Sequence, residues 1–422
     1  MRFDETDRLT NMSPSGRSPR VLYCTDTYPP QVNGVSVVTA LSIAGLIKRG
    51  WECQVIAPTY PTAPRVGVRA PRSDGLFGIP SLAFPPYPDI RLAAPAYGRV
   101  EDIVRRFQPD LIHSATEFMI GRLGQIAAQR ARVPSLSSYH TDFSRYTEAY
   151  GVPWLRQTVS RYIGRFHRRS ARVYTPSEQA RDDLAGIGVD RVEVWGCGVD
   201  TAAFSPAHRS QRVRAAYGVS ETELLFVHVG RLAAEKGVDR ILRGFARASA
   251  LFPSGFMRLV IAGAGPEEES LRAGAPANVT FLGVLDRDTT LPSLYASSDA
   301  FLFSSLTETL GLVVLEAMAS GLPVIATPAG GVAAHLRHGR NGLAFAPNDS
   351  DGMAGSIISL ALDADLRRRL SEGARQTAEV LTWEAELDRL DASYRAVLAE
   401  AGQPGDWAAG QRSYADRVAF GD

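Results

Sequence analysis

The stretch DAFLFSSLTETLGLVVLEAMASGLPVIATPAGG, residues 299–331, decides how this chain folds. Residues 300–303 form a short apolar run typical of a buried strand, and residues 322–326 form a second one. Between them, residues 310–319 place apolar side chains at helical spacing, and Gly321 stands where a helix commonly ends in the left-handed conformation. A strand, a helix and a strand joined by short loops predict a unit of parallel sheet.

Two carboxylates mark this unit. Glu308 precedes the predicted helix and Glu316 lies within it. Eight helical residues span about 12 Å, so the two side chains cannot share one proton or one metal ion. Amides at the helix start offer hydrogen-bond donors to an anion, and they belong to Thr309, Leu310, Gly311 and Leu312. This pattern suits a sugar diphosphate joined to a ribose; the alternative is a solvated Glu316 and a Glu308 that only begins the helix.

The spacing E-x7-E followed by AMASGLPVIA resembles the donor-site signature of retaining glycosyltransferases of family 4. The resemblance extends from Arg20 to Leu398. It implies the α/β GT-B fold, in which two Rossmann-like domains face each other across a cleft. The expected parts are a disordered tail (1–19), an acceptor domain (20–204), a nucleotide-sugar domain (205–382), a helix that packs back on the first domain (383–400) and a second tail (401–422).

Composition agrees with a two-domain cytoplasmic protein. A chain of 422 residues is too long for one compact core. Its formal charge of +1 gives no general attraction to nucleic acid. Three scattered cysteines, Cys24, Cys53 and Cys197, lack the spacing of a metal site and predict a reducing compartment, with the first two buried. Neither a signal peptide nor a membrane span is expected, so the chain is predicted to be cytoplasmic, or peripheral on the inner face of the cell membrane.

The first half opens with a strand, a loop, a helix expected over residues 36–49, and a second strand. The loop lacks G-x-G-x-x-G, which argues against a dinucleotide-dependent dehydrogenase. Asn33 and Gly34 stand just before the helix. The resemblance implies that Gly34 faces the donor diphosphate, with close backbone approach at one point. A plain turn is the alternative.

A histidine follows the predicted strand at residues 136–139, in the segment SYHTDF. Ligands of open α/β sheets bind at the carboxyl ends of the strands. The resemblance implies that His140 bonds the transferred sugar, and that Asp142 orients His140 or contacts the acceptor. A satisfied structural histidine is the alternative.

Two cations open the second half, in the segment GRLAAEKG. Arg231 and Lys236 follow a buried strand, where they can neutralise the charge that grows on a leaving nucleoside diphosphate. The family carries this motif as its diphosphate-binding site. The alternative is a surface salt bridge among Arg231, Glu235 and Lys236.

The nucleotide base is expected near two further loops. The segment GAGPEE lacks the third glycine of a dinucleotide motif, and the resemblance places its Gly263 near the base. Leu285, after the strand at residues 279–282, is expected to pack against the base. No cofactor is expected besides the nucleotide sugar.

Three D-x-D triplets raise the question of a metal ion. Those beginning at Asp349 and Asp363 fit helix ends, and the one at Asp286 is the nearest to the predicted site. We expect no bound metal, because Arg231, Lys236 and the helix start supply positive charge instead.

A basic amphipathic segment, residues 152–173, is expected to be helical. It predicts either a surface for anionic lipid or a solvated face packed on the sheet.

These patterns suit a sugar nucleotide bound between two Rossmann-like halves, and the resemblance implies a metal-independent hexosyltransferase of the retaining type. Glu308 would bind hydroxyls of the donor sugar and Glu316 those of the ribose. The resemblance is to the branch that includes bacterial mannosyltransferases and sulfoquinovosyl-diacylglycerol synthases, so GDP-mannose is the favoured donor and a UDP-sugar the next. The acceptor is a lipid, a glycan or a small molecule. The alternatives are a GT-B sugar-nucleotide epimerase and a non-catalytic nucleotide-sugar sensor.

Overall fold

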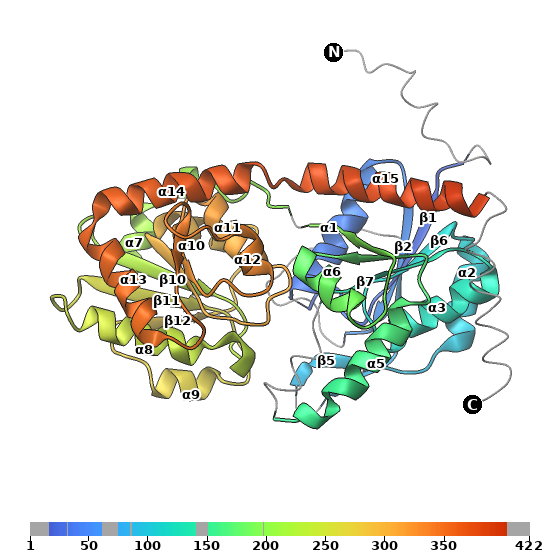
Figure 1. Ribbon diagram of the computed structural model, residues 1–422, viewed down its shortest axis with the longest axis horizontal. Helices are drawn as coiled ribbons and strands as arrows, with labels where there is room; N and C mark the ends of the chain where they lie inside the picture. The colour runs from blue at the N-terminus through green and yellow to red at the C-terminus, as the bar shows by residue number, and fades with distance from the viewer. Residues whose placement is uncertain are drawn as a thin grey trace, which may run out of the picture.

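The computed structural model describes residues 17–31, 33–60, 75–84, 87–140, 151–196 and 198–402. They form two α/β domains that lie side by side, each with a parallel sheet and flanking helices (Figure 1). The prediction of two Rossmann-like halves is confirmed by this architecture.

The first domain is built on seven parallel strands in the order β3-β2-β1-β6-β7-β8-β9. Strand β1 reads as an apolar run after Arg20, because both of its faces are buried. The strands are β1 (Arg20–Cys24), β2 (Glu52–Pro58), β3 (Leu76–Ile79), β6 (Leu111–Ser114), β7 (Ser135–Ser138), β8 (Arg172–Thr175) and β9 (Val192–Val194). The helices are α1 (Gly34–Lys48), α2 (Tyr97–Phe107), α3 (Met119–Ala131), α5 (Arg156–His167) and α6 (Glu178–Ala185). A separate antiparallel pair consists of β4 (Ser81–Phe84) and β5 (Tyr87–Ala93).

The second domain has six parallel strands in the order β12-β11-β10-β13-β14-β15. They are β10 (Leu224–Val229), β11 (Met257–Ala262), β12 (Val279–Gly283), β13 (Ala300–Phe303), β14 (Val324–Ala326) and β15 (Gly342–Ala344). The helices are α7 (Gln211–Ala216), α8 (Val238–Ser249), α9 (Glu268–Ala273), α10 (Thr290–Ser297), α11 (Leu312–Ala319), α12 (Gly331–His335), α13 (Ser350–Leu362) and α14 (Ala364–Glu379).

The order of strands reverses direction between β1 and β6 in the first sheet and between β10 and β13 in the second. Ligands of open α/β sheets bind beyond the carboxyl ends of the strands at such a reversal. The loops after these four strands carry most of the predicted site residues, so the topology itself brings them to the right edge of each sheet.

Two segments join the domains and run together. The amide of Val199 donates to the carbonyl of Leu381 at 2.8 Å, and Val199 pairs with Thr382 in an isolated parallel bridge. A Cβ atom at Gly198 would lie 2.2 Å from the backbone nitrogen of Trp383. Only glycine permits this approach. The two connections between the domains are therefore in direct backbone contact, and together we call them the joint.

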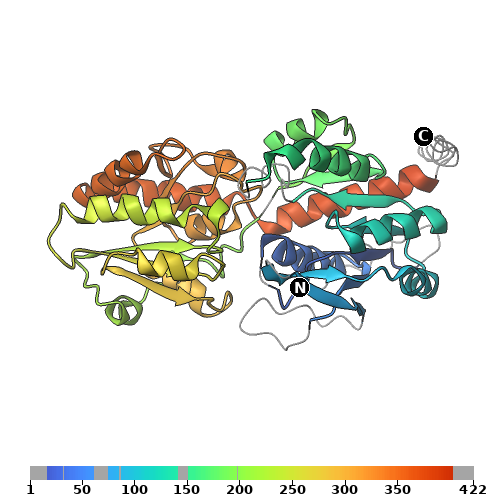
Figure 2. The ribbon, with the colours of Figure 1, turned by 90° about the horizontal axis from the view of Figure 1, so that it is seen from below.

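The last helix, α15 (Trp383–Gly402), lies across the first domain, as was expected of a returning helix (Figures 1 and 2). Two indole groups of that domain hold it: Trp51 Nε1 donates to Asp391 Oδ1 at 2.6 Å, and Trp195 Nε1 donates to the carbonyl of Glu386 at 2.7 Å. The helix thus continues the second domain's chain while belonging to the core of the first.

A buried polar network anchors α15 to the sheet. The Tyr394 hydroxyl lies 2.7 Å from that of Tyr23 and also contacts Nδ1 of His113, whose Nε2 lies 2.7 Å from Ser138 Oγ. Burial lowers the pKa of His113 to about 3, so this histidine is neutral at physiological pH. The network connects the returning helix with β7, the strand that leads to His140.

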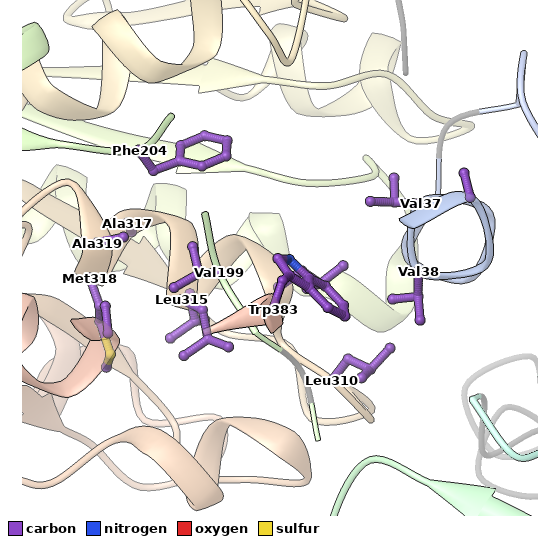
Figure 3. Packing of buried hydrophobic residues seen from close by; sticks show 14 of the residues in the cluster. Val37, Val38, Val199, Phe204, Leu310, Leu315, Ala317, Met318, Ala319 and Trp383 are labelled. Atoms are coloured by element: carbon purple, nitrogen blue, oxygen red, sulfur yellow. The ribbon is translucent and has the colours of Figure 1, made fainter. Parts of the chain in front are cut away.

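One apolar cluster spans both domains. Figure 3 shows Val37 and Val38 of α1 beside Trp383 and Leu310, with Val199 on the other side of the indole. Leu310 belongs to the loop after β13, so a loop of the second domain packs directly against the first helix of the first domain.

Several predicted boundaries are wrong in detail. Helix α11 begins at Leu312 rather than at residue 310, because Gly311 adopts a left-handed conformation with φ of 67°. Helix α1 begins at Gly34, where Asn33 caps it. The basic segment is not one helix: it contains a 3-10 turn, η2 (Pro153–Leu155), then α5, and ends in strand β8.

The predicted ends of the chain also differ. Arg17, placed in the disordered tail, forms an ion pair with Asp110 at 2.7 Å. Helix α15 continues to Gly402, beyond the predicted end of the returning helix. Cys24 is buried as expected, whereas Cys53 is only half-buried, and Cys197 lies outside the described residues. No described helix offers the long apolar stretch that crossing a bilayer requires.

Candidate active site

The loops after β10 and β13 meet through an ion pair. Lys236, in the 3-10 turn η4 (Ala234–Lys236), places Nζ against Oε1 of Glu308. Both side chains are mostly buried, with exposed fractions of 16% and 17%. Ser304 Oγ donates to the carbonyls of Lys236 and Gly237 at 3.0 and 2.7 Å, which fixes the turn to the end of β13. A cation and a carboxylate are therefore presented together at the carboxyl edge of the sheet.

Arg231 lies in the same loop and pairs with Glu235 rather than with Glu308. The guanidinium is 3.7 Å from the Glu235 carboxylate, whose side chain is only 1% exposed. The alternative was a surface salt bridge among Arg231, Glu235 and Lys236. Of its members, Arg231 and Glu235 are paired, Glu235 is buried, and Lys236 pairs with Glu308.

Glu316 is buried on α11, with 3% of the residue exposed. Arg287 contacts it from the loop after β12: Nε and Nη2 donate to the same oxygen, Oε1, at 3.0 and 2.6 Å. The alternative of a solvated Glu316 is therefore wrong. Sequence reasoning did not find Arg287, because nothing in the segment DRDTT marks its guanidinium as a partner for a helix residue far along the chain.

A pair of glycines supports the Glu308 loop. The amide of Gly331 donates to the carbonyl of Glu308 at 2.7 Å. A Cβ atom at Gly330 would lie 2.0 Å from that carbonyl oxygen, and one at Gly331 would lie 2.4 Å from the Thr309 carbonyl oxygen. The GG dipeptide after β14 was the sequence signal for this contact. It allows the loop after β14 to lie against residues 308–310.

The expected base-binding loops lie along the same edge. Gly263 has φ of 137°, and a Cβ atom there would be 1.8 Å from the carbonyl oxygen of Gly230. Its amide donates to the carbonyl of Gly283 at 2.7 Å. The glycine is therefore needed for packing the loops after β10, β11 and β12. Leu285 is half-buried and packs against the main apolar cluster.

In the first domain, Asn33 caps α1: its Oδ1 accepts from the Ser36 amide at 2.9 Å, and its Nδ2 donates to Thr27 Oγ1 at 2.7 Å. A Cβ atom at Gly34 would meet no atom of the described residues within 4 Å. The first turn of α1 thus presents its amides at the carboxyl edge of the sheet.

His140 follows β7 and is buried, with 6% of the residue exposed. Its carbonyl oxygen accepts a hydrogen bond from Thr309 Oγ1 of the second domain. Burial, and then the neighbouring His167, lower the pKa of His140 to about 4. Its Nδ1 finds no hydrogen-bond partner among the residues that the structure describes. A neutral imidazole therefore lies where the two domains touch. Asp142 lies outside the described residues.

A carboxylate–imidazole pair lies in the first domain, and the sequence analysis did not predict it. Oε1 of Glu117 is 3.4 Å from Nε2 of His167, whose Nδ1 is 2.9 Å from Ser137 Oγ. Burial raises the pKa of Glu117. In the sequence, the only signal for this pair was Glu117, which follows strand β6 in the segment SATEF.

The D-x-D triplets serve local structure. Asp349 caps α13 and Asp363 caps α14, as their positions indicated. Asp286 accepts hydrogen bonds from the amides of Asp288 and Thr289 at 3.0 and 2.9 Å. Within the described residues, no three side chains of His, Cys, Asp or Glu gather as metal ligands would.

Comparison with known protein families identifies both halves of the chain. Residues 32–203 match the family described as Glycosyltransferase Family 4, and residues 210–377 match the family described as Glycosyl transferases group 1.

Two similar relatives carry the name GDP-mannose-dependent alpha-mannosyltransferase. The protein from Mycolicibacterium smegmatis is 34% identical over 387 residues, which cover 90% of this chain and 98% of the relative. The one from Mycobacterium tuberculosis is 32% identical and covers 90% of this chain and 97% of the relative. Sulfoquinovosyl transferase SQD2 of Arabidopsis thaliana is 32% identical over 74% of this chain and 61% of its own length.

Among solved structures, sucrose-phosphate synthase from Thermosynechococcus elongatus superposes with a TM-score of 0.71 at 20% identity, covering 91% of this chain and 100% of that one. The glycosyltransferase WaaG, involved in lipopolysaccharide biosynthesis, superposes with a TM-score of 0.67 at 17% identity, over 89% and 99% of the two chains. These likenesses concern the fold.

Proposed function

This chain belongs to glycosyltransferase family 4 and acts on nucleotide sugars, and from that premise we propose that it transfers mannose from GDP-mannose to a hydroxyl acceptor with retention of configuration and without a metal ion. The observation that carries the proposal is the Lys236–Glu308 ion pair beside Arg231, next to the point where Thr309 reaches His140. Positive charge for a diphosphate and a carboxylate for sugar hydroxyls are thereby held within one loop pair.

Each side chain then has a distinct role. Arg231 and Lys236 neutralise the charge that develops on the leaving diphosphate. The amides at the starts of α1, with Gly34, and of α11, with Gly311 and Leu312, donate to phosphate oxygens. Glu308 binds hydroxyls of the donor sugar.

The remaining contacts complete the donor and the acceptor sides. Glu316 binds the ribose, and the loops of Gly263 and Leu285 border the base. His140 is neutral, and its Nδ1 has no hydrogen-bond partner among the described residues, so it accepts from or donates to a hydroxyl of the transferred sugar.

Retention follows from attack on the face that the leaving group vacates. The bond from the anomeric carbon to the phosphate oxygen breaks as the acceptor oxygen bonds to the same face of that carbon. The acceptor's proton moves to the departing phosphate oxygen. This sequence requires positive charge at the diphosphate, which Arg231 and Lys236 supply, and no enzyme nucleophile.

GDP-mannose is favoured as the donor because two relatives that cover nearly all of this chain are named for it. A UDP-sugar is second. For the acceptor we propose a lipid or glycan hydroxyl. A relative from Streptococcus pneumoniae, 30% identical over 73% of this chain, is named alpha-monoglucosyldiacylglycerol synthase.

A lipid acceptor would fit the exposed face of η2 and α5. Trp154 is 71% exposed, and Leu155 and Tyr162 are each 43% exposed. Arg161 and Arg165 lie exposed on the same helix. Aromatic groups beside arginines are suited to the interface of an anionic membrane. We propose peripheral docking through this face. In a vesicle sedimentation assay, Trp154→Ser should reduce binding to vesicles containing phosphatidylglycerol, and equal binding of both proteins would contradict it.

A thermal-shift panel tests the donor site directly. GDP, UDP, ADP and their sugars are compared with and without EDTA, and a ligand at 100 times its Kd adds roughly 2.7 kcal/mol of stability. A shift produced by GDP that survives EDTA is expected. Release of GDP from GDP-mannose then separates an enzyme from a sensor, and an unchanged sugar configuration in the product separates transfer from epimerisation.

A further inference from the structure

The pairing of Arg287 with Glu316 is asymmetric. Both donating nitrogens of Arg287, Nε and Nη2, reach Oε1 of Glu316, at 3.0 and 2.6 Å. Neither of these two bonds uses the second carboxylate oxygen, Oε2. Two donors on one oxygen hold that oxygen in place and leave Oε2 to other donors. The Tyr295 hydroxyl, which hydrogen-bonds the Glu316 side chain, is one such neighbour, and a carboxylate can accept from several donors at once.

Arg287 is itself held in place. Its guanidinium carbon lies 5.1 Å from the centre of the Phe204 ring, a distance typical of a cation–π contact. Phe204 is 1% exposed and ends the segment that joins the domains after β9. The Arg287 side chain is 17% exposed and that of Glu316 is 4% exposed. Arg287 therefore lies between the interdomain segment and helix α11.

The buried surroundings of Glu316 require a cation beside its carboxylate. Tyr295, on α10, is fully buried, and burial followed by the negative charge of Glu316 raises its pKa well above the ordinary value. A carboxylate in such surroundings is costly to bury unless it is paired. Arg287 supplies that pairing before any donor is present.

We propose that Arg287 is a positioning residue for donor binding, which holds the Glu316 carboxylate in one orientation so that its second oxygen accepts from a ribose hydroxyl. The inference rests on the proposed function, because it presumes that Glu316 contacts the ribose. It adds a residue from the loop after β12 to the donor site, and connects that site to the joint between the domains through Phe204.

The alternative interpretation predicts the opposite change in nucleotide affinity when Arg287 is replaced. If Arg287 merely occupied Glu316 until a donor displaced it, removing the guanidinium would free the carboxylate and tighten nucleotide binding. If Arg287 positions Glu316, removing it weakens binding. The stacking on Phe204 and the double use of one oxygen favour a guanidinium that stays in place.

The test measures Kd by titration calorimetry for GDP and 2′,3′-dideoxy-GDP, and for UDP and its dideoxy counterpart. The proteins are the full chain, Arg287→Met, Glu316→Gln and the double variant. We expect the unmodified protein to prefer the ribonucleotide by about tenfold, the size of one charge-assisted hydrogen bond. Each single variant should lose most of that preference, and the double variant should be no worse than either single one.

Arg243→Met is the matched control, because Arg243 forms an exposed i,i+4 pair with Asp239, with 55% and 47% of the side chains exposed. Its ribose preference should equal that of the unmodified protein. If Arg287→Met does not fold, Arg287→Lys retains the charge without the planar fork and should show an intermediate preference.

Three results would overturn the inference. Tighter GDP binding by Arg287→Met would make Arg287 a competitor, and an intact ribose preference in that variant or in Arg287→Lys would make it irrelevant to the donor. An intact preference in Glu316→Gln would remove the ribose role of Glu316 itself. The absence of any nucleotide binding by the unmodified protein would instead refute the proposed function.

Discussion

Lys236 offers the sharpest test of the leaving-group argument, because the chain contains only two lysines, Lys48 and Lys236. Lys48 ends helix α1 and is exposed, whereas Lys236 is 16% exposed and paired with Glu308. Lys236→Met therefore removes the ammonium from the proposed site while Lys48→Met provides a control of the same chemistry. We expect the first variant to lose turnover and the second to retain it.

The size of the loss follows from two contributions. A charge-assisted hydrogen bond from Nζ to a phosphate oxygen is worth roughly 1.5–3 kcal/mol, which corresponds to about 10- to 150-fold in donor affinity. Donors aimed at charge that develops in the transition state contribute about 10²–10³-fold in kcat. In addition, Glu308 is left without its cation and faces the diphosphate with an uncompensated negative charge. We expect kcat to fall about 10²–10³-fold.

The assay follows release of GDP from GDP-mannose by ion-exchange chromatography, with water as the acceptor until a better one is known. Lys236→Met combined with Glu308→Gln should recover part of the GDP affinity, because the unpaired carboxylate is gone, but none of the turnover. GDP should also protect Lys236, and not Lys48, from acetylation by acetic anhydride. Equal turnover of Lys236→Met and the unmodified protein would refute the role of Lys236 at the leaving group.

Three further changes probe the donor site and the fold. Glu316→Ala should raise the Kd for GDP about tenfold or more, and native-like binding in calorimetry would remove Glu316 from the site. Tyr394→Phe removes a hydroxyl shared by two buried partners and should lower the free energy of unfolding in urea by about 2–3 kcal/mol, whereas Tyr97→Phe, at an exposed position, should change it little. Burial lowers the pKa of His228 to about 4, so the unfolded chain binds its proton first and stability falls as pH drops below 6.5. Between pH 7 and 5.5, the free energy of unfolding should therefore fall by roughly 1 kcal/mol less in His228→Gln than in the unmodified protein. Equal decreases in the two proteins would contradict this assignment.

Local signals in the sequence were sufficient for the architecture. The apolar runs at residues 300–303 and 322–326 became buried strands of the second sheet. Asp349 caps α13 as its position indicated. Gly321 ends the α11 segment with φ of 77°. These features depend on residues that are close together in the chain, which is why a single sequence reveals them.

The pairing of charges could not be read in the same way. Lys236 was compared with its sequence neighbours, but its partner is Glu308, 72 residues away. Arg287 and Glu316 are 29 residues apart and meet only because β12 ends and α11 begins at the same edge of the second domain. The contact of Thr309 with His140 joins residues of different domains. Such contacts follow from strand order and loop packing, which local patterns do not encode. The ligand roles of these residues stay predictions.

The two carboxylates of the donor site are paired before a donor arrives, yet the two pairs differ in burial. Lys236 and Glu308 are 16% and 17% exposed, whereas Glu316 is 4% exposed against Arg287. We expect a diphosphate to compete with Glu308 for Lys236 and so to release that carboxylate toward the sugar hydroxyls that we assign to it. Arg287 should stay with Glu316, because leaving would strand a buried charge. We therefore expect donor binding to exchange the partner of Lys236 while the Glu316 carboxylate stays in place.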